Sequence, residues 1–256
     1  MDLGFLGTAW AVSTEERDNT SIFLKSGNTF ILVDCPGNVW GRLLKMRLNP
    51  LELDAIFITH GHVDHVYGLP SLLEMMRLNG RKRPLSIYVG EDFLVLVEKL
   101  LDLFEIANHP DSFKIDLFGL DYKSSLFRVK DLMIETFPVN HTVRNLALKF
   151  RNDNVSIVYS SDTAYHEPLA EFASNCDVLI HEATMSTKLG DAFREGHSTP
   201  SDAARIAEKA RVKQLFLVHV DFQLVKIPKR LLRKRETFSM VLLSYQKILK
   251  STVSRR

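Results

Sequence analysis

The stretch Thr59-His60-Gly61-His62-Val63-Asp64-His65 places three histidines and one aspartate within six positions. It directly follows the apolar run 55–59 (AIFIT), which we expect to be a buried β-strand. Neutral imidazole and carboxylate are ligands for Zn²⁺ and related divalent metals. Because a turn after a strand lets alternate side chains converge, the spacing predicts a metal site there. The alternative, a histidine-rich surface loop, accounts for one such residue better than for the whole cluster.

This motif resembles the defining His-x-His-x-Asp-His motif of the metallo-β-lactamase superfamily. The resemblance implies an α/β (α+β) fold class: a four-layer αββα sandwich with the metals at one edge, between the two sheets. It also implies further ligands downstream, and His141, Asp162 and His219 follow predicted strands in the family's order. By this resemblance, His60, His62 and His141 hold one metal and Asp64, His65 and His219 hold a second, with Asp162 bridging both.

Two positions narrow the resemblance within the superfamily. His62 stands where the diiron flavoprotein branch has a glutamate, and Asp162 stands where one group of β-lactamases has a cysteine. The pattern therefore favours a hydrolase with two divalent metal ions. Zinc is the expected metal, with manganese or iron as alternatives.

Three further segments resemble the ribonuclease Z branch of that superfamily. The first is N-terminal and consists of two short stretches, Phe5-Leu6-Gly7-Thr8 and Asn19-Thr20-Ser21. The second is His181-Glu182-Ala183-Thr184, and the third is Gly196-His197-Ser198-Thr199. The resemblance thus covers most of the chain, from residue 5 to residue 219. It implies a phosphodiesterase, with endonucleolytic cleavage of RNA and tRNA 3′ processing as its specific form.

The resemblance also assigns catalytic roles. Asp64 would bind the second metal and hold the attacking hydroxide, and His197 would protonate the leaving alkoxide. Glu182 would orient His197 or a substrate hydroxyl; the alternative is a buried pairing that only braces the loop. His181 points oppositely on an extended segment and stays outside the predicted site, and His109 and His166 are expected at the surface.

Two departures from the branch concern RNA binding. Asp162 lies only 21 positions after His141, which leaves no room for the arm that tRNA-processing enzymes insert there. The last ligand is followed by Val220-Asp221-Phe222-Gln223 rather than by a Ser-x-Arg-Tyr segment. Clusters of basic residues could compensate by binding phosphates, or could be solvated helix faces. They are Arg77, Arg81, Lys82 and Arg83; Lys226, Lys229, Arg230, Arg233, Lys234 and Arg235; and Lys247, Lys250, Arg255 and Arg256.

The composition is that of a globular domain. Of the 256 residues, 45% are hydrophobic and 25% are charged, a composition that excludes a disordered chain. The net charge of +2 does not by itself indicate a nucleic-acid binder. We expect one domain over residues 1–256, including a basic C-terminal helix over about 229–250. The absence of an 18-residue apolar run predicts no membrane span, and the cytoplasm is the expected compartment. Cys35 and Cys176 are expected to be free thiols, and a homodimer is expected.

The periodicity of the remaining chain predicts helices and strands in alternation. We expect strands at 21–24, 29–34, 85–89, 114–118, 126–129, 133–139, 147–150, 155–160, 178–180 and 214–218, and helices at 69–78, 93–106 and 200–209. Two alternatives to an RNA-cleaving enzyme remain open. One is a hydrolase of a small ester, thioester or cyclic phosphodiester on the same metals, and the other is a catalytically silent RNA-binding or scaffold protein.

Overall fold

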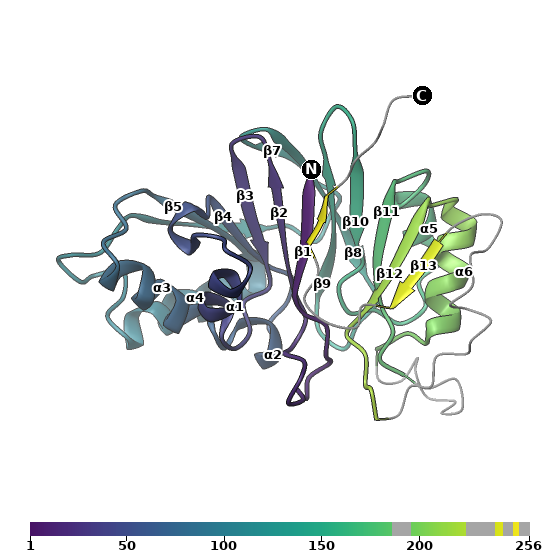
Figure 1. The fold of residues 1–256 in the computed structure, drawn as a ribbon. Coiled ribbons are helices and arrows are strands. Elements are labelled where there is room, and N and C mark those ends of the chain that lie inside the picture. Colours follow the sequence, from purple (N-terminus) through teal and green to yellow (C-terminus); the bar gives the residue numbers. More distant parts are fainter. Residues whose placement is uncertain (186–195, 224–238, 243–247, 251–256) are drawn as a thin grey trace.

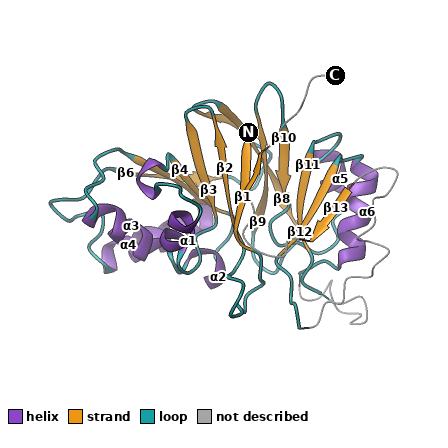
Figure 2. Ribbon diagram, in the orientation of Figure 1, coloured by secondary structure: helices purple, strands orange, loops and turns teal. Residues whose placement is uncertain are grey.

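The computed structural model describes residues 1–185, 196–223, 239–242 and 248–250 of the chain. Two seven-stranded sheets lie face to face in the middle of the molecule, with helices on the two outer sides (Figures 1 and 2). The first sheet runs in the order β14-β1-β2-β3-β4-β5-β6 and the second in the order β13-β12-β11-β10-β9-β8-β7. This arrangement is the αββα sandwich that the sequence predicts.

The strands have the following bounds: β1 Asp2–Gly7, β2 Ser21–Ser26, β3 Thr29–Val33, β4 Ala55–Ile58, β5 Leu85–Gly90, β6 Ile115–Leu120, β7 Leu126–Val129, β8 Leu132–Val139, β9 Asn145–Arg151, β10 Ser156–Tyr159, β11 Val178–Glu182, β12 Gln214–Val218, β13 Ser239–Leu242 and β14 Ile248–Lys250. In both sheets an antiparallel meander continues into parallel strands: β3 to β6 in the first sheet, and β10 to β13 in the second. Parallel strands end at the same edge of a sheet, so polar residues that follow them are brought together.

The helices fall into two groups, one for each sheet. Their bounds are α1 Val39–Lys45, α2 Val63–Val66, α3 Leu69–Leu78, α4 Glu91–Leu103, α5 Pro168–Phe172 and α6 Pro200–Ala210, with a 3₁₀ turn at Pro50–Glu52. Helices α1 to α4 lie beside the first sheet, and α5 and α6 lie beside the second (Figure 1). Each group buries apolar residues against the outer face of its sheet, which gives the two outer layers.

The central core is formed by the inner faces of the two sheets. The Phe5 and Phe216 rings, from β1 and β12, have centroids 5.4 Å apart, and the Phe57 and Phe150 rings, from β4 and β9, are 6.0 Å apart. All four side chains are at most 1% exposed. Aromatic pairs at these separations fill the space between the sheets and fix their spacing.

The C-terminal helix predicted over about 229–250 is wrong for the residues that are described there. Strand β13 pairs in parallel with β12, and β14 pairs antiparallel with β1. Pairing with an open sheet edge satisfies backbone hydrogen bonds over a short segment, and such tertiary context overrides local helical spacing. Residues 229–238 and 243–247 lie outside the described residues, as do most of the basic residues of this tail.

Other differences are smaller. The sequence gives no indication of α1 or α5, because seven and five residues are too few for a clear helical period. His109 and His166, expected at the surface, are half-buried. Both cysteines are free and buried. No helix among the described residues combines the length and the apolar character needed to cross a bilayer.

Candidate metal centre

The predicted metal ligands come from strand ends at one edge of the sandwich. Residues 60–65 follow β4 and lead into α2, while His141 follows β8, Asp162 follows β10 and His219 follows β12. All of these strands point the same way within their sheets, so their carboxyl ends meet. The structure therefore brings all seven predicted ligands together.

Three imidazole nitrogens form the first group of donor atoms. His62 Nδ1 lies 3.0 Å from His60 Nε2 and 3.1 Å from His141 Nε2. A tetrahedral Zn²⁺ with Zn–N distances of about 2.0–2.1 Å requires ligand nitrogens roughly 3.3 Å apart. The spacing of this group is close to that value.

The second group consists of two imidazole nitrogens and a carboxylate. Asp64 Oδ2 lies 3.3 Å from His219 Nε2 and 3.5 Å from His65 Nε2. Asp162 Oδ2 is 3.2 Å from His219 Nε2, 3.3 Å from His65 Nε2 and 3.8 Å from His60 Nε2. The Asp162 carboxylate thus stands between the two groups, in the position of a bridging ligand.

Two atoms of this cluster test whether metal ions fit it. His65 Nε2 and Asp162 Oδ1 are fully buried, and neither has a hydrogen-bond partner. A buried polar atom without a partner costs free energy, so native structures rarely leave one. A divalent cation would satisfy both atoms, and a donor set of imidazoles and carboxylates suits Zn²⁺, Mn²⁺ or Fe²⁺. The residues present therefore fit the group of metals that the sequence predicts.

Asp34 was not predicted as part of the site, yet it orients one of the predicted ligands. His65 Nδ1–H donates to Asp34 Oδ2 at 2.9 Å, which leaves Nε2 free for a metal. The Thr59 amide and hydroxyl and the Tyr159 hydroxyl also donate to this carboxylate. The only available signal was an aspartate directly after the buried run 29–33, which on its own resembles an ordinary turn residue.

Three other predicted histidine ligands are held in a similar way. His141 Nδ1–H donates to the Gly196 carbonyl at 2.7 Å, and His219 Nδ1 lies 2.7 Å from Thr184 Oγ1. His60 Nδ1 lies 3.1 Å from Thr59 Oγ1. Such outer contacts fix the tautomer and ring orientation of a metal-binding histidine.

Backbone strain accompanies this arrangement at three positions. Asp34, Ser161 and His219 adopt φ values of 59°, 53° and 51°, in the left-handed region that residues other than glycine rarely occupy. Each of the three residues follows a strand and belongs to the site or precedes one of its ligands. Strain of this kind persists where surrounding contacts determine the conformation, and it clusters at functional sites.

The electrostatics of the cluster favour an ionised carboxylate at its centre. Burial alone would raise the pKa of Asp162, but His219, His65 and His60 around it hold that pKa well below its usual range. Burial, reinforced by the neighbouring His65, lowers the pKa of His60 well below its ordinary value. A neutral His60 and a charged Asp162 are the forms that bind cations.

His197 and Glu182 form a pair beside the second group. His197 Nδ1–H donates to Glu182 Oε1 at 2.8 Å, and the His197 ring stacks on His219 with centroids 5.3 Å apart. Glu182 is fully buried and also accepts hydrogen bonds from the backbone N–H groups of Thr163 and Thr184. Burial would lower the pKa of His197, but the Glu182 carboxylate raises it to about 9. Glu182 therefore contacts His197, as one of the two predicted alternatives requires.

His181 lies outside these groups, as expected. It is buried on β11, and its Nδ1–H donates to the Glu182 carbonyl at 2.8 Å. It belongs to none of the clusters among the described residues whose donor atoms could hold a metal.

The N-terminal segments that resemble ribonuclease Z support the last ligand. The His219 amide donates to Thr20 Oγ1 at 3.0 Å, and the next amide, of Val220, donates to the Thr8 carbonyl at 3.1 Å. Gly7 lies so close to the returning chain that a Cβ atom there would stand 1.9 Å from the Asn19 carbonyl oxygen. Only glycine lets β1 and the loop before β2 approach in this way.

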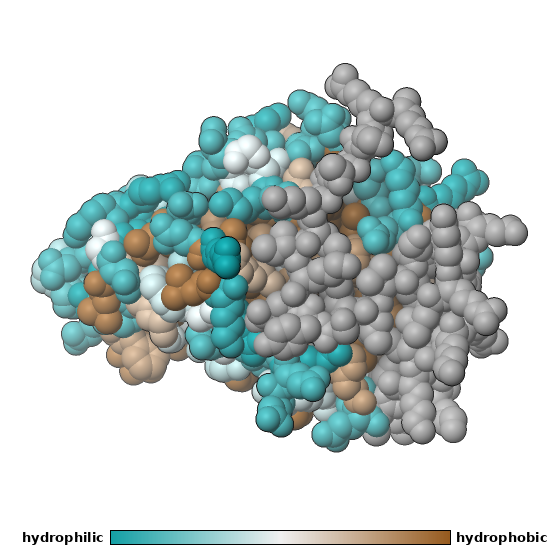
Figure 3. Space-filling view, in the orientation of Figure 1, coloured by the Kyte–Doolittle hydropathy of each residue, from teal (hydrophilic) through white to brown (hydrophobic). Residues whose placement is uncertain are grey.

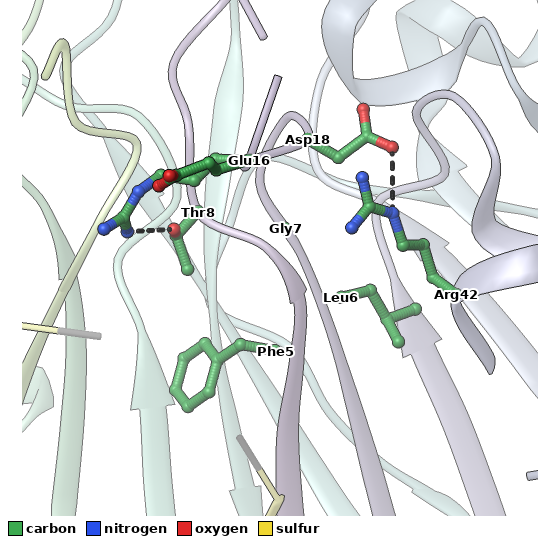
Figure 4. Close-up of a pocket in the computed structure, with 8 residues that line it drawn as sticks. Phe5, Leu6, Gly7, Thr8, Glu16, Asp18 and Arg42 are labelled. Carbon is green, nitrogen blue, oxygen red and sulfur yellow. Dashed lines mark hydrogen bonds and ion pairs between the residues drawn. The ribbon is translucent and has the colours of Figure 1, made fainter. Parts of the chain in front are cut away.

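Figure 4 shows a small cavity beside this N-terminal loop. Arg17 donates to the Thr8 hydroxyl, and Arg42 pairs with Asp18 at 3.4 Å. The cavity measures about 10 Å³, which is room for about one water molecule. It is a packing feature of the loop and too small to be a substrate pocket.

A larger apolar groove runs between α3 and α4. It measures about 630 Å³, and its lining includes Tyr67, two residues after His65, and Phe104. Leu103 and Phe104 at the end of α4 are 74% and 57% exposed. Hydrophobic side chains gather on this part of the surface in Figure 3.

The basic cluster at residues 77–83 does not face the site. Arg81 is 2% exposed and donates to the carbonyls of Leu51, Leu53, Arg83 and Pro84. Arg77 pairs with Glu74, and Arg83 pairs with Asp54. Residues 81–83 precede β5, whose start lies at the opposite edge from the end of its parallel neighbour β4. Arg81 is therefore a structural residue, which neither expectation included, whereas Lys82 is exposed to solvent.

Known proteins resemble the chain over most of its length. The family model described as "Beta-lactamase superfamily domain" matches residues 29–220. The Ribonuclease Z of Methanocaldococcus jannaschii is 28% identical over 274 residues, which cover 86% of this chain and 86% of the relative. Because that alignment is longer than this whole chain, the relative contains inserted residues that this chain lacks.

Solved structures agree on the fold. The human short-form tRNase Z has a TM-score of 0.83 and 24% identity, covering 99% of this chain and 100% of that one. YhfI, a metallo-β-lactamase-fold protein from Bacillus subtilis, has a TM-score of 0.82 and 20% identity, with 97% and 98% covered. These likenesses establish a shared architecture, with the cluster described above at its edge.

Proposed function

The chain belongs to the β-lactamase superfamily, and from this premise we propose that it is a metal-dependent phosphodiesterase of the ribonuclease Z type that cleaves RNA. The observation that carries the proposal is the combination of two ligand groups sharing Asp162 with the His197–Glu182 pair beside them. A silent scaffold protein has no need for a buried histidine–carboxylate pair next to such a cluster.

Two divalent ions would be held by the predicted ligands, one by His60, His62, His141 and Asp162, and the other by Asp64, His65, His219 and Asp162. We propose zinc, with manganese and iron as the alternatives that the same donors accept. Bound there, such ions supply Lewis-acid stabilisation of phosphoryl charge and make water more acidic.

The protein's own groups complete the chemistry. His197 is protonated near neutral pH because of Glu182, so it can deliver a proton to the leaving oxygen of the substrate. Glu182 fixes the ring and keeps that proton on His197. Asp64, with one carboxylate oxygen towards His219, is placed to hold the attacking water as well as the second ion.

The charge distribution bears on the substrate. Residues 1–223 contain 23 Lys and Arg against 30 Asp and Glu, whereas residues 224–256 contain ten basic residues and one acidic residue. An acidic body repels a polyanion, so RNA binding depends on the basic tail. Cleavage at the 3′ end of tRNA is the specific form that we propose. A small phosphodiester, ester or thioester is the second candidate, favoured by the missing arm and the acidic body.

An assay with matched substrates tests the proposal. Unprocessed tRNA with a 3′ trailer, bis(p-nitrophenyl) phosphate, a thioester and a β-lactam are compared with metal present and after chelation, with His60→Ala as the control. We expect metal-dependent cleavage of both phosphodiesters and little turnover of the other two. Preferred thioester hydrolysis, or no turnover by fully metal-loaded protein, would refute the assignment.

The homodimer and the cytoplasmic location stay predictions from the sequence. The exposed apolar groove between α3 and α4 is the face to test for self-association. Sedimentation of the wild type beside Phe104→Asp, at matched concentrations, separates a dimer that uses this face from a monomer.

A further inference from the structure

The Thr184 hydroxyl lies between the proton-donor pair and the second ligand group. Its oxygen is 2.8 Å from Glu182 Oε2, 2.7 Å from His219 Nδ1 and 2.8 Å from the His219 carbonyl oxygen. The side chain is 1% exposed, so water does not compete for these contacts. No other described hydroxyl touches both a predicted ligand and Glu182.

The hydrogen-bond inventory fixes the direction of these contacts. A threonine hydroxyl donates one hydrogen and accepts up to two. When His219 binds a metal through Nε2, its Nδ1 carries the hydrogen, so Thr184 Oγ1 accepts there. The hydroxyl hydrogen is then left for the two neighbouring acceptors, Glu182 Oε2 and the His219 carbonyl.

The other oxygen of the same carboxylate continues the connection. Glu182 Oε1 accepts from His197 Nδ1–H at 2.8 Å, so an unbroken series of contacts runs from His219 through Thr184 and Glu182 to His197. We propose that Thr184 is a positioning residue that orients the second-site ligand His219 and the proton donor His197 together. This inference rests on the proposed function and adds a named link between its two parts.

The alternative is that Thr184 only fills space. Thr184→Val keeps the shape of the side chain but leaves the His219 Nδ1–H without its acceptor and removes one donor from Glu182. Thr184→Ser keeps the hydroxyl and removes only a methyl group. The two substitutions therefore separate hydrogen bonding from packing.

Metal affinity gives a readout that does not depend on activity. In a competition titration of the purified protein with a chromophoric zinc chelator, Thr184→Val should weaken the binding of one of the two zinc ions about 10- to 100-fold, as outer-contact substitutions at metal sites do. The other zinc should be unchanged, and Thr184→Ser should bind both zinc ions nearly as the wild type does, because it keeps the hydroxyl. The same substitution at Thr136, which is fully buried on β8 and bonded to Ser125 and Lys123, is the matched control.

Activity at saturating zinc tests whether Thr184 also orients His197 through Glu182. Thr184→Val should lose more kcat on a phosphodiester with an alkoxide leaving group than on one that releases p-nitrophenolate, because His197 is then less well oriented. Equal losses on the two substrates, wild-type affinity for both zinc ions, or a serine variant as impaired as the valine variant would each overturn the proposal.

Two controls keep the test decisive. Thermal unfolding of the metal-free variants identifies a valine variant that does not fold, in which case Thr184→Ala and Thr184→Ser are compared by the same titration. If the wild type cleaves no phosphodiester, the proposed function fails, whereas the zinc titration still decides whether Thr184 supports His219.

Discussion

Two buried carboxylates outside the ligand set each hold one imidazole of the site. Asp34 accepts from His65 at 2.9 Å, and Glu182 accepts from His197 at 2.8 Å. The two histidines are placed differently, however. His65 Nε2 points into the group of predicted ligands, whereas the His197 ring stacks on His219 beside that group. The different roles proposed for the two rings, metal ligand for His65 and proton donor for His197, thus follow from where each ring is placed.

Removing one ligand from either group should lower metal content. His60→Ala and His219→Ala each delete one donor of a group whose remaining atoms are spaced for a shared ion. We expect reduced occupancy in both variants by inductively coupled plasma mass spectrometry, with His109→Ala as the control outside the cluster. Two fully loaded ligand variants would show that these residues do not bind the metals.

Removing the proton donor should affect poor leaving groups most. His197→Ala is expected to lower kcat by about 10²–10⁴-fold on a substrate that releases an alkoxide, and by less on one that releases p-nitrophenolate. Steady-state kinetics on the two substrates measures the difference. If both rates fell equally, His197 would serve to position the substrate instead.

The Glu182 carboxylate should set the alkaline limit of activity. It raises the pKa of His197 to about 9, so the protonated donor persists at neutral pH and is lost as pH rises through that value. Glu182→Gln removes the charge and lowers this pKa, so the alkaline limb of kcat/KM should move to lower pH. A pH profile with the alkoxide-releasing substrate checks this, and an unmoved limb would contradict the role assigned to Glu182.

For single residues, the sequence predicts the ligands but not the residues that hydrogen-bond to them. Residues 60–65 form a compact motif, and the later ligands follow apolar runs, so both leave a readable pattern. That they bind metal stays a prediction, although the structure places them together. Asp34 and Thr59 have no such pattern, because a lone polar residue after a strand looks like any turn.

The start of helix α6 is determined by the residues at its N-terminus. Thr199 Oγ1 accepts from the Asp202 amide, Asp202 accepts from the Thr199 amide, and Pro200 occupies the first turn. This capping box satisfies backbone donors that a helix start otherwise leaves unpaired. It also fixes the chain two residues after His197.

Loss of this cap should cost stability. Thr199→Ala should lower the free energy of unfolding by about 1 kcal/mol, within a range of roughly 0.5–2 kcal/mol, while Thr199→Ser should be nearly neutral. Urea unfolding followed by circular dichroism measures both. An alanine variant as stable as the serine variant would show that other contacts hold the helix start.

The strands that the sequence misses are the two C-terminal ones, which each pair with the edge of a sheet. Strand β13 needs the edge of β12, the preceding described strand, and β14 needs the edge of β1, near the other end of the chain. Strands such as 126–129 and 214–218 are predicted to the residue because their apolar runs are bounded by clear turns. Local patterns therefore predict most strands of both sheets, including the edge strand β7, but not the C-terminal strands β13 and β14.

At the scale of the whole molecule, the separation of charge should appear as salt dependence. Replacing Lys226, Lys229, Arg230 and Arg233 with glutamine should weaken RNA cleavage and flatten its dependence on salt, by up to about one unit of log–log slope for each phosphate that is no longer neutralised. Turnover of a small phosphodiester should not change. These substitutions are preferable to deleting residues 229–256, which would also remove β13 and β14.

Lys82→Gln is the control, because this exposed lysine lies at the opposite edge of the first sheet. Rates measured between low and physiological salt decide the outcome. Efficient processing of unprocessed tRNA that does not respond to salt, or to removal of the tail charges, would show that the acidic body binds RNA by itself.

The pairing of β1 with β14 also determines when the first sheet can be completed during synthesis on the ribosome. β1 is synthesised early and its outer neighbour late, so the first sheet keeps an open edge through most of translation. The two ligand groups are also completed in order of synthesis. The three-histidine group is complete once His141 has emerged, whereas the second group is complete only after His219 has emerged. Metal capture during synthesis is therefore expected to begin at the histidine triad, and the nascent chain needs protection from edge-to-edge association until its last strands arrive.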